Sequence, residues 1–169
     1  GSEGFAKAKS GQVFTLAWPA GLAAEALHIL VLPRRVSATE ARKAGAKLAE
    51  ARGTKALTVK VGNMARAADL ALGLQLRSYA FDAHKTAESE AMGQITLCHA
   101  KPEELEASYA PLQAVAEGVH MTRDLVNEPA NVLTTTEFAD RLVEMKSLGL
   151  EVEVLEEAEL EALGMRTLL

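Results

Sequence analysis

The stretch Leu27-His28-Ile29-Leu30-Val31-Leu32, followed by Ser37-Ala38-Thr39-Glu40, decides the fold class of this chain. The first run is almost entirely apolar, as in a central strand that is covered on both faces. The second has the residue order of a capping box, in which Ser37 caps the Glu40 amide and Glu40 returns the bond. It opens an alanine-rich helix that we expect to run to about Arg52 and to end at Gly53. A strand followed by a helix is the repeating unit of an α/β fold.

Outward from this unit, short apolar runs continue to alternate with helical patterns. Residues 14–18 alternate in a strand that Pro19 ends, residues 57–61 alternate in a second strand, and a third lies around residues 95–97. Residues 64–80 show a helical stripe wide enough for contact on two sides. The pattern predicts an α/β sandwich with a mostly parallel central sheet.

A long helical pattern covers residues 102–126, and Pro111 interrupts it, so we expect either a kink or a second helix that begins there. Asn127-Glu128-Pro129-Ala130-Asn131 then predicts a turn, because proline removes a backbone donor and pushes Glu128 out of the helical region. Thr134-Thr135-Thr136-Glu137 has the order of another capping box. These residues predict a helix, a turn and a second helix.

The last part of the sequence predicts a strand and a short helix. Leu150, Val152 and Val154 alternate with glutamates, which is typical of a half-exposed strand. Glu156 to Leu163 follows as a short acidic helix. Its acidic residues point to several faces, so we interpret them as a solvated surface and not as a metal-binding cluster. These residues are Glu156, Glu157, Glu159 and Glu161.

Composition excludes several classes of protein. The 169 residues are 49% hydrophobic and 24% charged, and the net charge is −5. This acidic balance argues against a nucleic-acid or anionic-membrane surface, which needs clustered Lys and Arg. No run approaches the ~20 apolar residues of a membrane span.

The cysteine and histidine residues do not predict a metal site. The single cysteine, Cys98, cannot form an intrachain disulfide, and we expect an inert, partly buried thiol. The four histidines, His28, His84, His99 and His120, lack zinc-ligand spacing. We expect His28 in the core or at a strand edge.

Two pairs of charged residues are candidates for structural contacts. Asp82 and Lys85 can form an exposed ion pair worth only ~0–1 kcal/mol. Arg123 and Asp124 lie beside the proline turn, where they either support an active site or are simply exposed.

Several segments closely resemble the M17 family of leucyl aminopeptidases. They are Arg123-Asp124-Leu125-Val126-Asn127-Glu128-Pro129-Ala130-Asn131, Val152-Glu153-Val154-Leu155 and Glu159-Leu160-Glu161-Ala162-Leu163-Gly164-Met165. Tyr79-Ala80-Phe81-Asp82-Ala83-His84-Lys85-Thr86 resembles a motif of the family's N-terminal domain, which usually has an aromatic residue where His84 stands. The resemblance runs from about Gly21 to Leu169 and is loose before residue 75.

The resemblance implies a cytosolic, usually homo-hexameric metallo-exopeptidase that removes Leu-like N-terminal residues from peptides, using two divalent metal ions, Zn or Mn. In the family the metal ligands follow the segment that ends in Gly164-Met165. The chain is therefore expected to be an inactive fragment that serves assembly and access. We expect no catalytic, metal-binding or substrate-binding residue and no cofactor in it.

The resemblance also implies an organisation in three parts. Residues 1–100 are expected to form a three-layer, macro-domain-like N-terminal domain, residues 101–127 a connecting helix, and residues 128–169 the truncated start of the peptidase domain. The alternative is a stand-alone α/β domain for scaffolding or for binding a nucleotide such as ADP-ribose. No glycine-rich phosphate loop supports nucleotide binding, and a shared fold does not transfer a ligand.

Overall fold

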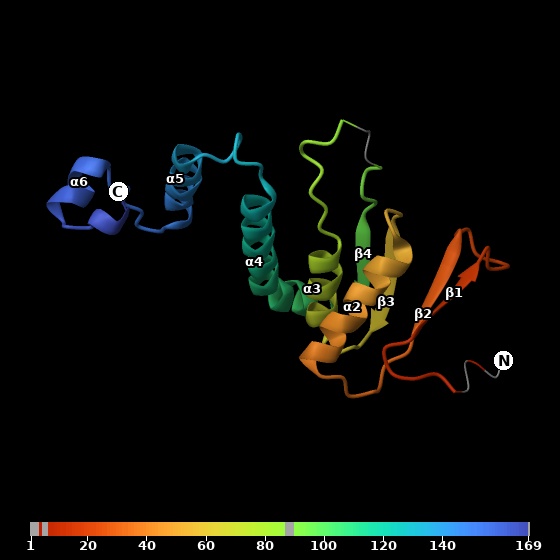
Figure 1. Ribbon diagram of the computed structural model, residues 1–169. Helices are drawn as coiled ribbons and strands as arrows, with labels where there is room; N and C mark the ends of the chain where they lie inside the picture. The colour runs from red at the N-terminus through yellow and green to blue at the C-terminus, as the bar shows by residue number, and fades with distance from the viewer. Residues whose placement is uncertain (1–3, 5–6, 87–89, 169) are drawn as a thin grey trace. The chain divides into compact units, whose positions relative to one another are not determined.

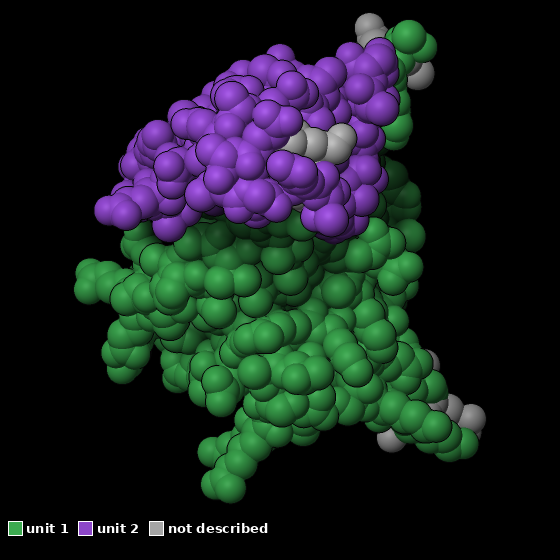
Figure 2. All heavy atoms as spheres, turned by 60° about the vertical axis from the view of Figure 1, so that its left-hand side comes forward, with its two compact units in different colours: residues 1–122 green, residues 123–169 purple. Residues whose placement is uncertain are grey.

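The computed structural model describes residues 4, 7–86 and 90–168. They belong to two compact units, residues 1–122 and 123–169, which Figure 2 shows in different colours. In the described part of the chain, no helix is long and apolar enough to cross a membrane.

Helices and short strands alternate along the first unit, which confirms the mixed α/β class (Figure 1). In chain order, the elements are β1 (Val13–Ala17), β2 (Ala26–Leu30), α2 (Ala38–Arg52), β3 (Leu57–Gly62), α3 (Ala67–Arg77), β4 (Ile95–His99) and α4 (Pro102–Asn127). The last residues of α4 belong to the second unit, which continues with α5 (Thr135–Glu144), the 3₁₀ helix η1 (Met145–Leu148), α6 (Glu157–Ala162) and the 3₁₀ helix η2 (Arg166–Leu168).

The described strands form two separate sheets of two strands each. β1 and β2 are antiparallel, with Val13 opposite Leu30, whereas β3 and β4 are parallel, with Leu57 opposite Ile95. The prediction of one mostly parallel central sheet is therefore wrong for these strands. Leu27, in the run predicted as a central strand, is 36% exposed. An apolar run this short does not show which strand will pair with it, because pairing depends on contacts distant in sequence.

The core of the first unit lies between α2, α3 and the strands. Its five buried members come from the two helices: Ala41, Leu48, Ala49, Leu70 and Leu74. Apolar side chains from all four strands pack against this cluster, among them Val13, Leu30, Val59, Ile95 and Leu97. Both sheets therefore share one apolar core.

Helix α2 begins and ends where the sequence predicts. Ser37 Oγ accepts from the Glu40 amide at 3.3 Å, and Glu40 Oε2 accepts from the Ser37 amide at 2.9 Å. Gly53 ends the helix with a φ of 60°, a conformation that glycine adopts at little cost. Helix α3 is shorter than predicted, but its residues Ala67 to Leu74 are all buried, which fits the predicted contact on two sides.

Arg52, in the last turn of α2, is a buried cation that the sequence does not reveal. It is 5% exposed. Its Nη1 donates to the carbonyls of Lys55 (2.6 Å) and Gly93 (2.9 Å), and its Nη2 donates to Ser78 Oγ at 3.1 Å. Burial lowers the pKa of the Arg52 guanidinium. This side chain joins the end of α2 to the end of α3 and to the segment before β4.

Helix α4 continues through Pro111, so a second helix does not begin there. Figure 1 shows α4 changing direction in its first half, as expected for the predicted kink. The cause is the proline ring, which removes one amide donor and crowds the preceding turn.

The predicted strand at Leu150, Val152 and Val154 is wrong. Residues 151–156 are not in a helix or a strand. Alternating residues predict an extended backbone, but a strand also needs a hydrogen-bonded neighbour, and no described strand pairs with this segment. The short acidic helix is confirmed as α6.

Candidate functional site

The proline turn of the second unit is held by a partly buried ion pair. Glu128 immediately precedes Pro129, and its Oε1 lies 3.3 Å from Nη2 of Arg141 in α5. The Glu128 side chain is only 10% exposed and that of Arg141 is 31% exposed. The sequence does not predict this pair, because the two residues are thirteen positions apart on different elements. It ties the turn to the helix that follows.

Backbone hydrogen bonds complete the turn. The amides of Val132 and Leu133 both donate to the Pro129 carbonyl at 2.9 Å. Thr134 Oγ1 then accepts from the Glu137 amide at 3.3 Å and caps α5, which confirms the Thr134 half of the predicted capping box. The helix, turn and helix expected here are therefore confirmed.

Arg123 and Asp124 differ in exposure. Arg123 is exposed, whereas Asp124 is half-buried, and both interact with other groups. Their expected support of an active site stays a prediction. The backbone holds Asp82 and Lys85 together, because the Lys85 amide donates to the Asp82 carbonyl at 3.0 Å.

The four histidines have separate environments. The expected strand position of His28 is confirmed, because it lies in β2 with its Nδ1 2.9 Å from Thr15 Oγ1. His99 ends β4, where its Nδ1 accepts from the Lys101 amide at 3.1 Å. The remaining two pack on aromatic rings: His84 at 5.7 Å from Phe81 and His120 at 5.2 Å from Tyr79.

Cys98 is exposed, so the expectation of a partly buried thiol is wrong. Side chains alternate along a strand, and Ile95 and Leu97 of β4 pack against the core. The intervening residues Thr96 and Cys98 are both exposed, as this alternation requires.

The described residues do not fit a metal centre. They contain no group of three or more His, Cys, Asp or Glu side chains that could hold an ion. The four glutamates of the α6 region are all exposed, as expected for a solvated surface: Glu156, Glu157, Glu159 and Glu161. A two-metal site needs convergent carboxylates with little access to bulk water, which this surface does not offer.

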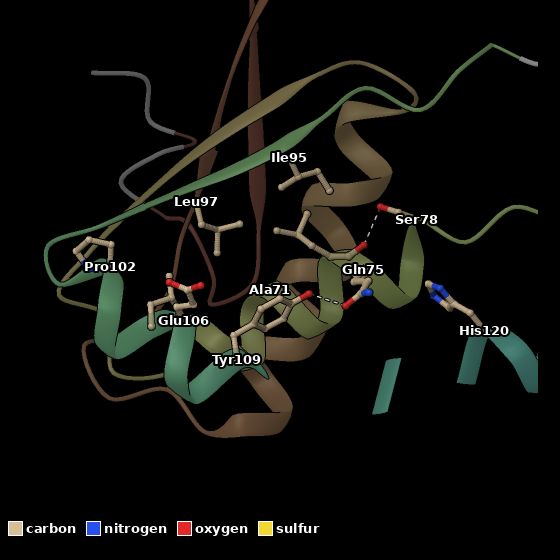
Figure 3. A pocket seen from close by; sticks show the side chains of 11 residues that line it. Ala71, Gln75, Ser78, Ile95, Leu97, Pro102, Glu106, Tyr109 and His120 are labelled. Atoms are coloured by element: carbon tan, nitrogen blue, oxygen red, sulfur yellow. Dashed lines mark hydrogen bonds between the residues drawn. The ribbon is translucent and has the colours of Figure 1, made fainter. Parts of the chain in front are cut away.

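A cavity of about 540 Å³ lies in the first unit beside α3, β4 and α4 (Figure 3). Apolar side chains form most of its wall, including Leu74, Ile95 and Leu97. Inside it, Tyr109 Oη donates to Gln75 Oε1 at 2.5 Å. Burial, and then the charge of Glu117, raise the pKa of Tyr109.

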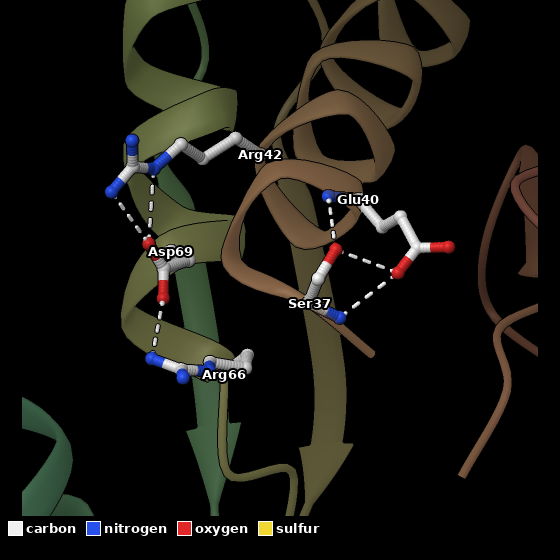
Figure 4. A network of polar contacts seen from close by, with 5 residues as sticks. All are labelled: Ser37, Glu40, Arg42, Arg66 and Asp69. Atoms are coloured by element: carbon white, nitrogen blue, oxygen red, sulfur yellow. Dashed lines mark hydrogen bonds and ion pairs between the residues drawn. The ribbon is translucent and has the colours of Figure 1, made fainter. Parts of the chain in front are cut away.

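Among the described residues of the first unit, Asp69 is the most buried carboxylate, and two arginines contact it (Figure 4). Asp69 Oδ1 lies 2.9 Å from Arg42 Nη2, and Asp69 Oδ2 lies 3.6 Å from Arg66 Nη1. Arg42 comes from α2, whereas Asp69 lies in α3. Both oxygens of the Asp69 carboxylate are already paired with arginines. The network therefore joins α2 to α3 and leaves neither oxygen free to bind a ligand.

The family model and the curated relatives that match this chain point to one family. Residues 120–169 match the catalytic-domain model of the cytosol aminopeptidase family. A probable cytosol aminopeptidase of Dinoroseobacter shibae is 52% identical over 168 residues, which cover 99% of this chain and 34% of the relative. A second, from Cereibacter sphaeroides, is 47% identical with the same coverage. The chain spans about a third of the length of these curated relatives.

A solved structure is similar to this chain in fold. The bottromycin maturation enzyme BotP matches 92% of this chain and 36% of its own, with a TM-score of 0.73 and 29% identity. BotP in complex with Mn matches with a TM-score of 0.72. The bacterial relatives are about half identical to this chain over nearly its whole length. This similarity shows that the chain belongs to the M17, or cytosol aminopeptidase, family.

Proposed function

We propose that this chain is the N-terminal third of a metal-dependent aminopeptidase that removes N-terminal residues, preferably Leu-like, from peptides. The observation that carries the proposal is the 52% identity to a probable cytosol aminopeptidase over 99% of the chain but only 34% of that relative. The parent enzyme is proposed to be cytoplasmic and to form a homo-hexamer.

We propose that the catalytic and metal-binding residues, and those that bind the substrate, all lie outside this chain. This chain spans only 34% of the relative, which leaves about two thirds of the enzyme to hold them. The solved complex of BotP with Mn supports a metal-dependent parent. Two divalent ions, Zn or Mn, would then be held by the remaining two thirds of the enzyme.

The chain itself would contribute assembly and access to the active sites. The second unit leaves large apolar side chains open to solvent: Phe138 is 43% exposed, Leu148 76% and Leu163 63%. Apolar groups left open in this way are typical of a surface that another part of a protein covers. We propose that the rest of the peptidase domain covers them.

We propose residues 1–100 as the N-terminal domain, 101–127 as the connecting helix and 128–169 as the start of the peptidase domain. The match of the catalytic-domain model to residues 120–169 supports a boundary in this region. The shared core of the two sheets supports a single layered, macro-domain-like domain before it.

Hydrolysis of leucine p-nitroanilide, with added Mn²⁺ or Zn²⁺, tests the proposal. A longer protein that contains this chain and matches the relatives in length should cleave the substrate and lose activity with a chelator, whereas the 169-residue chain should not. Turnover by the short chain would refute its non-catalytic role. A metal-loaded longer protein without aminopeptidase activity would refute the proposed reaction. Light scattering should show a hexamer for the longer protein only.

A further inference from the structure

A second cavity, which we call the arginine pocket, lies between two loops of the first unit. Its volume of about 390 Å³ is in the range of small-molecule sites, which hold roughly 300–1,000 Å³. One loop leads from β2 into α2, and the other leads from β3 into α3. The pocket combines three arginines with an apolar wall, and the residues that form it are Arg34, Arg35, Arg66, Leu32, Val36 and Met64.

Folding brings the three arginines together from two parts of the sequence. Arg34 and Arg35 form only a pair in the sequence, and the second loop adds Arg66. All three residues are exposed, so a ligand can reach their N–H groups from solvent. The whole chain has a net charge of −5, and a pocket lined by three cations is therefore a local reversal of its charge.

The buried carboxylate beside the pocket is mostly used by another residue. Asp69 Oδ1 lies 2.9 Å from Nη2 of Arg42, which does not line the pocket. Asp69 Oδ2 lies 3.6 Å from Arg66 Nη1, which is longer than a hydrogen bond (Figure 4). A guanidinium has five N–H donors, so most of those of Arg66 remain available to a ligand.

The other two arginines have no carboxylate partner in the described part of the chain. Neither Arg34 nor Arg35 forms an ion pair there. Glu40, near them at the start of α2, is turned to Ser37 instead, because its Oε2 accepts from the Ser37 amide at 2.9 Å and from Ser37 Oγ at 2.7 Å. Like charges around one pocket repel one another, and an anion inside it would be attracted by all of them.

We propose that the arginine pocket binds a small organic phosphate, whose dianionic group pairs with Arg34 and Arg35 and whose apolar body contacts Leu32, Val36 and Met64. The planar guanidinium fork matches the oxygens of a phosphate group. One phosphate ion fills only a fraction of the pocket, and the three apolar side chains also pack against the core, so the wall behind the arginines is fixed. The site lies within the first unit and does not depend on the proposed peptidase activity.

Phenyl phosphate, phenyl sulfate and phenol test the proposal on the 169-residue chain. They share a ring, and near neutral pH they carry about two, one and no negative charges. Methyl NMR spectra should show saturable shifts at Leu32, Val36 and Met64 with phenyl phosphate. Phenyl sulfate should bind about three- to tenfold more weakly, because it offers half the charge, and phenol should not bind measurably.

Single substitutions test the role of the arginines. Arg34→Gln and Arg35→Gln should each weaken phenyl phosphate about three- to tenfold. Both side chains are exposed, so the variants should unfold at the temperature of the wild type. Arg77→Gln is the matched control, because Arg77 is also exposed, carries the same charge and lies in the last turn of α3 outside the pocket. It should change the affinity less than about twofold.

Four results would overturn the proposal. The first two are an absence of saturable shifts with phenyl phosphate and equal affinities for phenyl phosphate and phenyl sulfate. Equal losses in Arg77→Gln and the two pocket variants would show only a general attraction of anions. Tighter binding of a short oligonucleotide than of phenyl phosphate would assign the arginines to a nucleic acid instead.

Discussion

Gly73 in α3 lies directly against the backbone of Arg42 in α2. A Cβ atom added to Gly73 would overlap the Arg42 carbonyl oxygen, and one added to Gly45 would overlap the Leu70 carbonyl oxygen. Two glycines therefore let the two helix backbones touch. This approach also brings the Arg42 side chain within 2.9 Å of Asp69 (Figure 4).

Replacing Gly73 with alanine should destabilise the first unit by about 1–3 kcal/mol, because the new methyl group must push two backbones apart. Gly118→Ala is the matched control, since Gly118 is also helical and nothing lies within 4 Å of an added Cβ. It should stabilise α4 by about 0.5–1 kcal/mol. Urea denaturation measures both changes, and equal effects of the two variants would refute the close approach.

The partly buried Glu128–Arg141 pair should stabilise the proline turn more than the exposed Lys101–Glu104 pair stabilises the start of α4. A double-mutant cycle tests this with Arg141→Met, Glu128→Gln and the double variant. Hydrogen exchange of the α5 amides measures the free energy of opening, and we expect a coupling energy of about 1–2 kcal/mol between the two residues. Lys101 and Glu104 provide the control, because their side chains are 64% and 67% exposed. Their coupling should stay within about 0–1 kcal/mol. The prediction fails if the exposed pair couples as strongly.

Local chemistry explains which elements could be predicted from the sequence. The capping residues Ser37 and Glu40 and the terminal Gly53 act within a few positions, so the bounds of α2 follow from the sequence. Pro129 likewise fixes a turn through its own ring. The family resemblance rested on the same turn, and the relatives confirm it.

Contacts between distant residues explain what the sequence did not show. Arg52 donates a hydrogen bond to the carbonyl of Gly93, 41 positions away. From the sequence alone, Arg52 is only a charged residue near a helix end. The pairing of β1 with β2, and the absence of a strand around Val152, depend on which neighbours are available. The cavity at His120 arises in the same way, from three elements whose packing no local pattern encodes.

The capping box of α2 should make stability depend on acid pH. Hydrogen bonds from the Ser37 side chain and backbone, and then the charge of Lys43, lower the pKa of Glu40 below its usual 4.5. A carboxyl with a lowered folded-state pKa stabilises the protein above its unfolded pKa, and this is lost as pH falls through the folded value. The stability advantage of the wild type over Glu40→Gln should therefore shrink from neutral pH to about pH 3.

The control repeats the Glu40→Gln comparison in a protein that also carries Ser37→Ala. Without the Ser37 hydroxyl, Glu40 loses the main cause of its lowered pKa, so Glu40→Gln should change the pH dependence of stability much less. Ser37→Ala itself should cost about 0.5–2 kcal/mol at neutral pH, as loss of a helix cap does. A pH-independent difference between wild type and Glu40→Gln would contradict the prediction.

Tyr109 should ionise at higher pH in the folded chain than in the unfolded chain. Burial beside the cavity, and then the negative charge of Glu117, raise its pKa above the usual 10.0. The sequence has two tyrosines, so Tyr79→Phe leaves Tyr109 alone in the tyrosinate absorbance. The midpoint should lie above 10.0 in buffer and return to about that value in denaturant.

The same shift predicts a loss of stability in alkali. A phenol with a raised folded-state pKa contributes its full stability below the unfolded value and loses it as pH rises through the folded value. The unfolding free energy of the wild type should therefore fall above about pH 10 more steeply than that of Tyr109→Phe. Glu117→Gln should lower the Tyr109 midpoint only in part, because burial is the larger cause. Identical midpoints with and without denaturant would show that Tyr109 is not buried beside the cavity.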